Sequence, residues 1–357
     1  MKKILVLGAG VSGLTTAFCL AKAGFRVSVV APDFSPRLTS NVAGALWEWP
    51  PAVCGYHTDP VSLERSKEWC MTSYARFHDL AQDERTGVFL RDVIFFFRYP
   101  IQENPDAEAK MNELQQKVRG FRRDAAMIAE EGVSSAAGMV DAYSHVAPMV
   151  DTDTYMPWLQ AQVAALDVEI AQATITEDLR TCQDGLLSHY GCDYIVNCTG
   201  LGAARIAGED MYPLRGALVR IKNDGRSFPV ISKAYCVSYD ERTAEQNIVF
   251  IVPRGKDMVV LGALAEADEW DTSINLQNYL PIREMFRRCK EFLPILEGAE
   301  LDPGEPVRVG LRPFRKGNVR LGWAPGTKII HNYGHGGAGV TFSWGCADEV
   351  VTMLNAT

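Results

Sequence analysis

The sequence predicts an α/β protein in which a Rossmann-like domain is joined to a second domain with a mixed, mainly antiparallel β-sheet. Three observations predict this class. An apolar strand, a glycine-rich turn and a helix follow one another within residues 3–24. Strand-like runs lie close together between residues 215 and 265, as in antiparallel sheets. Short strands with glycine or polar ends return at 193–200 and 305–333, so both parts are expected to be discontinuous in the sequence.

The remaining elements follow from the spacing of apolar residues. Apolar residues at helical spacing predict helices over 60–85 and 107–121, and a helix or helix pair over 276–294. An aspartate–threonine cluster at 151–154 is suited to cap a helix that runs to 165. Strands are predicted at 25–31, 93–100 and 168–175.

Composition excludes several classes of protein. The chain has 357 residues, of which 47% are apolar, so it can bury a large core without disulfides. A net charge of -8 argues against nucleic acid as a partner. No run of 18 apolar residues is present, so no membrane span is expected. The nine cysteines show no CxxC spacing, which indicates neither a zinc site nor a disulfide framework, and no metal is expected. With no SKL-type peroxisomal address at the C-terminus, a cytoplasmic location is expected.

The segment GAGVSG, Gly8–Gly13, fits the GxGxxG pattern of dinucleotide-binding turns. Its first glycine makes the tight turn, the second lets a pyrophosphate approach the backbone, and the third lets the helix pack close to the strand. The pattern follows an apolar strand and opens a helix, which is the context that the motif requires. An acid that binds the adenosine ribose is expected about 20 residues later. Asp33 is the candidate, although it lies one residue late and can equally be a solvated loop aspartate.

Four further stretches follow in a characteristic order. They are SPRLTSNVAGALWEWP (35–50), DYIVNCTG (193–200), VGLRPFRKGNVRLG (309–322) and HNYGHGGAGVTFSWGCA (331–347). Together with GAGVSG they resemble the D-amino-acid oxidase family, and they span nearly the whole chain. The resemblance implies bound FAD, a fold of the glutathione-reductase type, and oxidation of an amino acid to an imine and then a 2-oxo acid. Dioxygen is expected to reoxidise the flavin and yield hydrogen peroxide.

The resemblance also implies a division of the chain into domains. Residues 1–50, 140–212 and 305–357 are expected to form the FAD-binding domain, and residues 51–139 and 213–304 the substrate domain. The family is often dimeric, so a homodimer is possible.

Matching motif positions imply a set of cofactor-binding residues. Helix N-terminal amides, expected near Thr341, would stabilise the negative charge of a reduced flavin. The full set is Gly8, Ala9, Gly10, Val11, Ser12, Gly13, Asp33, Thr39, Ser40, Gly44, Ala45, Leu46, Ile175, Cys198, Thr199, Gly200, Arg320, Gly336, Gly337, Ala338, Gly339, Val340 and Thr341.

For the substrate, the resemblance places Arg312 at the catalytic site as the ligand of the carboxylate. A guanidinium group offers two parallel donors that match a carboxylate, which an ammonium group does not. Gly337 is expected beside the substrate. His331 and His335 are interpreted as scaffolding, because hydride transfer from a neutral amine requires no acid–base triad.

The sequence departs from the family at the substrate pocket. Two tyrosines of familiar D-amino-acid oxidases are replaced by Gln246 and Phe250 in QNIVFIVP, and the aromatic residue after HGG is replaced by Ala338. Losing a hydrogen bond to a charged group costs about 1.5–3 kcal/mol. Carboxylate binding is therefore weaker or rebuilt, with Tyr235 and Tyr239 as candidates. The departure leaves two enzyme hypotheses open: an oxidase of D-amino acids, or an oxidase or dehydrogenase of a specialised secondary amine, imino acid or L-amino acid. A degenerate flavin-binding protein is a third.

Overall fold

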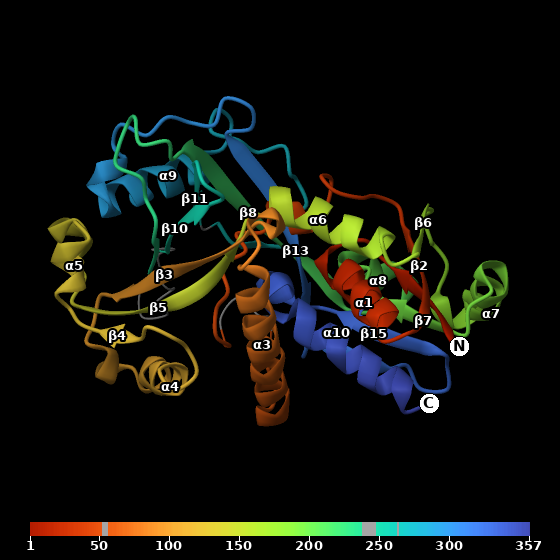
Figure 1. Cartoon of the computed structure of the whole chain (residues 1–357). Helices are drawn as coiled ribbons and strands as arrows, with labels where there is room; N and C mark the ends of the chain where they lie inside the picture. Colours follow the sequence, from red (N-terminus) through yellow and green to blue (C-terminus); the bar gives the residue numbers. More distant parts are fainter. Residues whose placement is uncertain (52–55, 238–247, 263) are drawn as a thin grey trace. The chain divides into compact units, whose positions relative to one another are not determined.

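The computed structural model describes residues 1–51, 56–237, 248–262 and 264–357 (Figure 1). The chain forms two compact units, and each is assembled from separate segments. The first unit contains Met1–Gly87, Thr152–Leu214 and Leu311–Thr357, and the second contains Val88–Asp151 and Arg215–Gly310.

A six-stranded sheet forms the centre of the first unit. Its order is β14-β15-β7-β1-β2-β6, with all neighbours parallel except the pair β14 and β15. The strands are β1 (Lys3–Leu7), β2 (Arg26–Ala31), β6 (Glu169–Gln172), β7 (Tyr194–Asn197), β14 (Arg320–Trp323) and β15 (Ile329–Tyr333). The central strand β1 is almost wholly buried because it has a neighbour on each side and helices on both faces.

Helices cover both faces of this sheet. Leu5 and Leu7 of β1 belong to an apolar cluster with α7 and α8, and side chains alternate along a strand, so α1 lies on the opposite face. The helices are α1 (Val11–Lys22), α2 (Thr39–Val42), α3 (Pro60–Leu80), α6 (Thr152–Ala164), α7 (Leu179–Tyr190), α8 (Ala203–Ile206) and α10 (Gly339–Asn355). Short 3-10 turns lie at Glu84–Thr86, Gly200–Gly202 and Gly336–Ala338. The arrangement confirms the predicted Rossmann-like domain.

Residues 56–87 belong to the first unit, whereas the family resemblance predicts residues 51–139 in the substrate domain. The reason is the packing of α3 on α10. A Cβ atom added to Gly345 would lie 2.3 Å from the Trp69 Cα, so the two backbones approach closely at this point. The rings of Trp69 and Phe342 meet edge to face at 5.9 Å.

The second unit is built on a nine-stranded sheet. Its order is β12-β8-β11-β10-β9-β3-β5-β4, with β13 paired to β8. β3 and β9 are parallel, whereas β10, β11 and β5 pair with their neighbours in antiparallel fashion. The strands are β3 (Val88–Phe97), β4 (Arg122–Arg123), β5 (Asp141–Val150), β8 (Met211–Lys222), β9 (Ala234–Val237), β10 (Val249–Arg254), β11 (Met258–Gly262), β12 (Glu266–Ala267) and β13 (Val307–Arg315). The predicted mixed, mainly antiparallel sheet is therefore confirmed.

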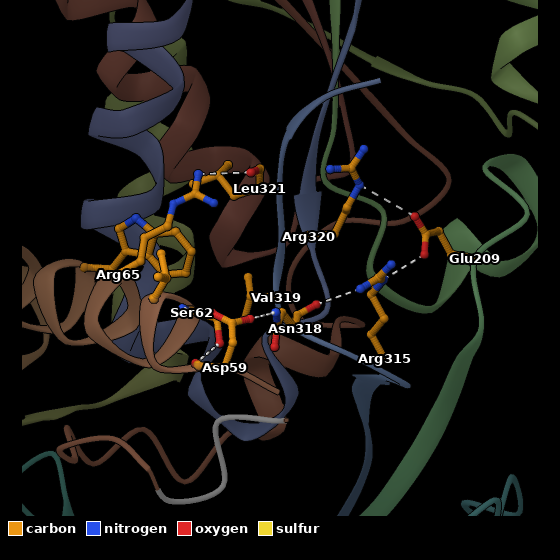
Figure 2. A pocket seen from close by; sticks show the side chains of 11 residues that line it. Asp59, Ser62, Arg65, Glu209, Arg315, Asn318, Val319, Arg320 and Leu321 are labelled. Atoms are coloured by element: carbon orange, nitrogen blue, oxygen red, sulfur yellow. Dashed lines mark hydrogen bonds and ion pairs between the residues drawn. The ribbon is translucent and has the colours of Figure 1, made fainter. Parts of the chain in front are cut away.

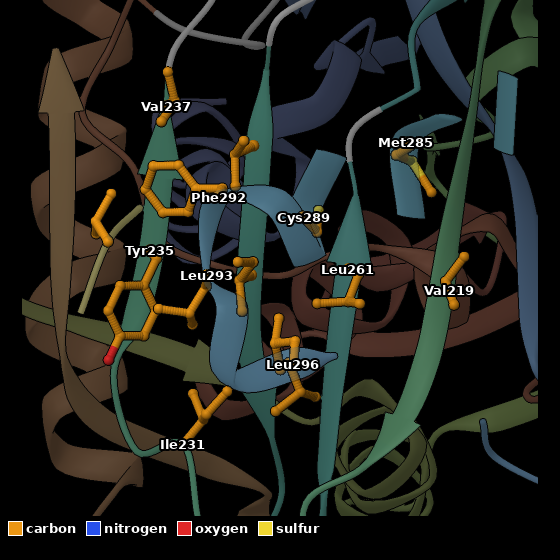
Figure 3. Packing of buried hydrophobic residues seen from close by; sticks show 14 of the residues in the cluster. Val219, Ile231, Tyr235, Val237, Leu261, Met285, Cys289, Phe292, Leu293 and Leu296 are labelled. Atoms are coloured by element: carbon orange, nitrogen blue, oxygen red, sulfur yellow. The ribbon is translucent and has the colours of Figure 1, made fainter. Parts of the chain in front are cut away.

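One face of this sheet buries an apolar core under α9 (Figure 3). The buried residues Ile282, Met285, Cys289 and Phe292 recur every three or four positions along α9, which explains why this segment is helical. The other short helices are α4 (Pro105–Leu114) and α5 (Met127–Glu130), with 3-10 turns at Ile101–Glu103, Ser135–Ala137 and Pro294–Leu296. None of the described helices is long and apolar enough to cross a membrane.

Candidate functional site

The GxGxxG turn joins β1 to α1 through two close backbone contacts. A Cβ atom added to Gly13 would lie 1.9 Å from the Gly8 carbonyl oxygen, so only glycine fits where the helix meets the turn. A Cβ atom on Gly8 would lie 2.5 Å from the Cys198 oxygen, and its φ of 108° is strained for any other residue. The structure thus requires both glycines, as the phosphate-binding interpretation does.

Ser40 reaches the amino end of α1 from the segment after β2. The N-cap residue is Gly10, which has no side chain to cap the helix. The Val11 amide instead donates to Ser40 Oγ at 2.9 Å. Amides and the positive end of the helix dipole therefore gather at a bare glycine surface, with a hydroxyl beside it. This combination suits a pyrophosphate group. The geometry brings together Gly8–Gly13 and Ser40, and Thr39 starts the short helix α2 beside it.

The NCTG stretch lies against the same turn. The Cys198 amide donates to the Leu7 oxygen at 2.8 Å, and the Thr199 amide and hydroxyl both donate to Asn197 Oδ1. Burial raises the pKa of the Cys198 thiol to about 12, so this cysteine is uncharged and acts in packing. Gly200 has a φ of 56°, a conformation that glycine adopts without strain.

The glycine stretch after β15 leads into α10. We expected the helix to begin near Thr341, but a 3-10 turn occupies Gly336–Ala338 and α10 already begins at Gly339. Among the described residues no side chain caps its N-terminus. The first amides of a 17-residue helix are therefore available to an anion. Gly337 is exposed, whereas Ala338 is buried.

Asn332 is a residue that the sequence analysis did not single out. Its side chain hydrogen-bonds the His335 Nε2 atom at 3.1 Å and donates to Thr16 Oγ1 of α1 at 3.1 Å. Its backbone oxygen accepts a hydrogen bond from Ser12 Oγ at 3.3 Å. Burial lowers the pKa of His335 to about 4, so the ring is neutral. Asn332 therefore ties the glycine loop to α1, and only its position within HNYGHGG could have indicated this.

Arg312 lies on β13, in the segment of that strand that belongs to the first unit. The residue as a whole is partly exposed, but its guanidinium group lies deep enough that burial lowers its pKa to about 10. It therefore remains a cation at neutral pH, in a position where desolvation strengthens any bond to an anion.

The neighbouring arginines have carboxylate partners. Arg315 donates from Nε to Glu209 Oε2 at 2.7 Å, and Arg320 Nε lies 3.7 Å from Glu209 Oε1. Arg65 of α3 pairs with Glu349 of α10. Glu209 and the three arginines line a cavity of about 540 Å³ in the first unit (Figure 2). Arg320 is thus placed in a charged cluster, and its predicted approach to the flavin stays a prediction.

Other predicted cofactor residues are distributed over the first unit. Asp33 follows β2 and pairs with Arg37 at 3.2 Å. The side chain of Asp33 is about half exposed. Ala45 has a φ of 51°, Leu46 is buried, and Ile175 packs against the apolar cluster beside α7. Their contacts to a cofactor stay predictions.

In the second unit Phe250 and Tyr235 lie on opposite faces of the sheet. Tyr235 is paired with Ile251, and both side chains belong to the buried core. The hydroxyl of Tyr235 donates to Glu131 Oε2 at 3.0 Å. Phe250, one residue from Ile251, points to the other face, so these two side chains do not share one pocket wall. Gln246 and Tyr239 lie outside the described residues.

Phe250 of β10 is paired with Gly262 of β11, which has no side chain. A Cβ atom on Gly262 would lie 3.3 Å from Phe250 Cδ1 and 3.0 Å from Leu218 Cδ2. The face that carries Phe250 is therefore apolar at this point.

Comparison with known proteins agrees with this geometry. The family model described as FAD dependent oxidoreductase matches residues 3–353. A D-amino-acid oxidase from Rubrobacter xylanophilus is 34% identical over 99% of this chain and 96% of its own length. A D-amino-acid oxidase from Streptomyces coelicolor is 32% identical over 99% of this chain and 97% of its own length.

Solved structures share the fold at low sequence identity. Glycine oxidase from Geobacillus kaustophilus aligns with a TM-score of 0.77 at 17% identity, covering 100% of this chain and 96% of that one. The predicted family, fold and cofactor are confirmed. The chain belongs to the family of FAD-dependent oxidoreductases that includes the D-amino-acid oxidases, and its cofactor is FAD.

Proposed function

We propose that this protein oxidises the amine of an amino acid, foremost a D-amino acid, to an imine that water hydrolyses to a 2-oxo acid. Two electrons and a proton leave the Cα–H bond as hydride, and a proton leaves the nitrogen. Dioxygen takes up the two electrons with two protons and becomes hydrogen peroxide. The observation that carries this proposal is the half-buried Arg312 on β13, in the unit that also holds the glycine turn and the N-terminus of α10, which no described side chain caps.

Each of these features has a defined task in the proposal. Bound FAD supplies the hydride acceptor and transfers the electrons to dioxygen. Gly8–Gly13 with Ser40 bind the pyrophosphate, and the first amides of α10 favour negative charge at the flavin. Arg312 holds the substrate carboxylate and thereby orients the Cα–H bond. His335 is neutral and buried, which suits scaffolding.

Phe250 supports a substrate with an apolar side chain. It stands where the family has a tyrosine, and its neighbours Gly262 and Leu218 are apolar. A charged substrate side chain on this surface would lose its hydration without a partner, which is costly. The preferred substrate is therefore apolar where it meets Phe250, and it is a more specialised compound than the neutral D-amino acids in general.

Because Phe250 replaces a tyrosine of the family, no phenol hydroxyl is present at this position. This absence also supports a second candidate function. A substrate that is held by fewer hydrogen bonds to its carboxylate could be a secondary amine, an imino acid or an L-amino acid, with dioxygen or another electron acceptor.

A peroxide assay over matched substrates separates the two. Purified yellow protein is offered D-phenylalanine, D-alanine, D-aspartate, L-phenylalanine, L-proline and N-methylglycine, and peroxide and the 450 nm flavin absorbance are followed. We expect turnover of D-phenylalanine or D-alanine above D-aspartate. Turnover confined to N-methylglycine or an L-amino acid establishes the second candidate. Anaerobic bleaching of the flavin by a substrate, without peroxide in air, identifies a dehydrogenase.

A homodimer in the cytoplasm completes the proposal. It is supported by the family resemblance and by the composition, and light scattering on the purified flavoprotein tests the dimer.

A further inference from the structure

Glu209 lies between α8 and β8. Its carboxylate links Tyr333, at the end of β15, to Arg315 of β13. Its Oε1 accepts a hydrogen bond from the Tyr333 hydroxyl at 2.9 Å, and its Oε2 accepts from Arg315 Nε at 2.7 Å. Tyr333 is the last residue of β15 and directly precedes Gly334. Figure 2 shows Arg315 and Arg320 both joined to this carboxylate.

The stem of Arg315 forms the surface on which the loop turns. A Cβ atom on Gly334 would lie 3.0 Å from Arg315 Cβ and 3.3 Å from its Cδ, and Gly334 has a φ of 82°. The guanidinium group is held at both ends, by Glu209 at Nε and by the Asn318 oxygen at 2.9 Å from Nη1. The position of the loop backbone thus depends on where the Arg315 stem is fixed.

The charge on Glu209 is maintained by its partners. Burial pushes the pKa of this carboxyl upward, but the hydrogen bonds from Arg315 and Tyr333 outweigh burial and hold the pKa below its usual range. The carboxylate is therefore ionised at neutral pH, and two arginines face it.

We propose that Glu209 is a positioning residue for the flavin loop, defined as Gly334–Gly337. Through Tyr333 and Arg315 it fixes both the start of the loop and the surface beneath it, and so sets the approach of the loop and of the α10 amides to the flavin. It acts through these two residues, and its role rests on the proposed place of the flavin at this loop.

The second unit offers a matched control. Glu266 has the same kinds of partner, since it accepts hydrogen bonds from the Tyr279 hydroxyl at 2.5 Å and from Arg215 Nη2 at 2.7 Å. Its side chain is 19% exposed, against 16% for Glu209. Removing either charge takes a close carboxylate from an arginine: from Arg315, whose side chain is 23% exposed, or from Arg215, which is 3% exposed and keeps Glu269 at 3.9 Å.

The experiment compares holoenzyme carrying Glu209→Gln with holoenzyme carrying Glu266→Gln. FAD dissociation is measured by the rise of flavin fluorescence on dilution, and the midpoint potential of the bound flavin by dye-linked reduction. We expect Glu209→Gln to raise the Kd for FAD at least tenfold and to make the potential more negative, because the amides stabilise the reduced flavin less. Glu266→Gln is expected to leave both unchanged.

Equal effects of the two substitutions on the Kd and the potential overturn the proposal. If Glu209→Gln does not fold, the Kd for FAD and the midpoint potential are measured on Tyr333→Phe instead, because this substitution removes only one hydroxyl group. A weaker change of the same sign supports the proposal, and an unchanged Kd and potential overturn it. None of these readouts involves an amino-acid substrate, so they stand apart from the substrate screen.

Discussion

At the scale of single residues, burial distinguishes Arg312 as the proposed ligand of the substrate carboxylate. Arg315 and Arg320 share the carboxylate of Glu209, and Arg65 pairs with Glu349. Burial destabilises the charged form of Arg312 and lowers its pKa to about 10. A substrate carboxylate would recover that lost stabilisation.

Replacing Arg312 tests its role directly. In Arg312→Ala the charge-assisted pair with the carboxylate is lost, at about 1.5–3 kcal/mol, which corresponds to a KM roughly ten- to hundredfold higher. Steady-state kinetics of peroxide formation measure the change. Arg308→Ala is the control, because Arg308 lies on the same strand and its Nε donates to Glu305, just before that strand. An unchanged KM in Arg312→Ala removes this residue from the substrate site.

Phe250→Tyr restores the phenol that this chain lacks. We expect the new hydroxyl to bond the carboxylate of a D-amino acid and to lower its KM about tenfold. Phe250→Leu, which adds no hydroxyl, is the control and should not lower the KM. A KM that rises or stays constant in Phe250→Tyr would show that the substrate carboxylate lies elsewhere.

At the scale of elements, close backbone contacts of glycines define how the helices pack. Gly13 brings α1 against the turn after β1, and Gly345 brings α10 against α3. The first contact could be predicted, because the GxGxxG pattern has a known geometry. The second could not, since a lone glycine inside a helical pattern carries no information about its partner.

Gly345→Ala tests the contact between α10 and α3. The added Cβ would lie 2.3 Å from the Trp69 Cα, so the helices must separate, at a cost of about 1–3 kcal/mol or more. Thermal unfolding of the holoenzyme should show a lower midpoint. Gly185→Ala is the matched control: Gly185 lies in α7 with no atom within 4 Å of an added Cβ, so alanine there should stabilise by about 0.5–1 kcal/mol. Equal midpoints for the two variants would contradict the packing described.

Local patterns predicted most elements but not their ends. The segment 276–294 was predicted as a helix or helix pair, and α9 occupies Leu280–Phe292, with Pro281 in its first turn. The helix predicted over 107–121 ends at Leu114, and Gly120 has a positive φ. In the site, the glycine motifs were predictable because backbone geometry demands glycine there. Glu209 and Asn332 were not, since their partners are distant in sequence.

At the scale of the whole molecule, buried histidines couple stability to pH. Burial lowers the pKa of His145, His331 and His335 to about 4. The unfolded chain has histidine pKa values near 6.5, so between about pH 4 and 6.5 it binds more protons than the folded protein. Stability therefore falls as the pH decreases through this window and is constant above it.

The expected slope is about 1.4 kcal/mol per pH unit for each such histidine. Urea unfolding of the holoenzyme at saturating FAD, at pH 7.5, 6.0 and 5.0, measures it. His145→Phe, in a ring stack with Phe95, should have a shallower slope. A stability that is independent of pH over this range would show that these histidines are charged in the folded state.

The order of motifs predicts two discontinuous domains, but it does not predict where α3 packs. Residues 60–80 carry an amphipathic pattern that fits either unit, and their contacts with α10, among them the close approach at Gly345, assign them to the first. Amphipathicity reports that a face is buried and not what buries it.

The division of the chain also governs the order of events during protein synthesis. The chain passes between the units at residues 87–88, 151–152, 214–215 and 310–311. The glycine turn after β1 leaves the ribosome long before β15 and α10, which complete the same unit. Domains usually fold as they emerge, but this one must wait for its final segment. FAD would then be captured only after α10 has emerged, and a nascent chain stalled before Gly334 would expose the apolar face of α1 to chaperones.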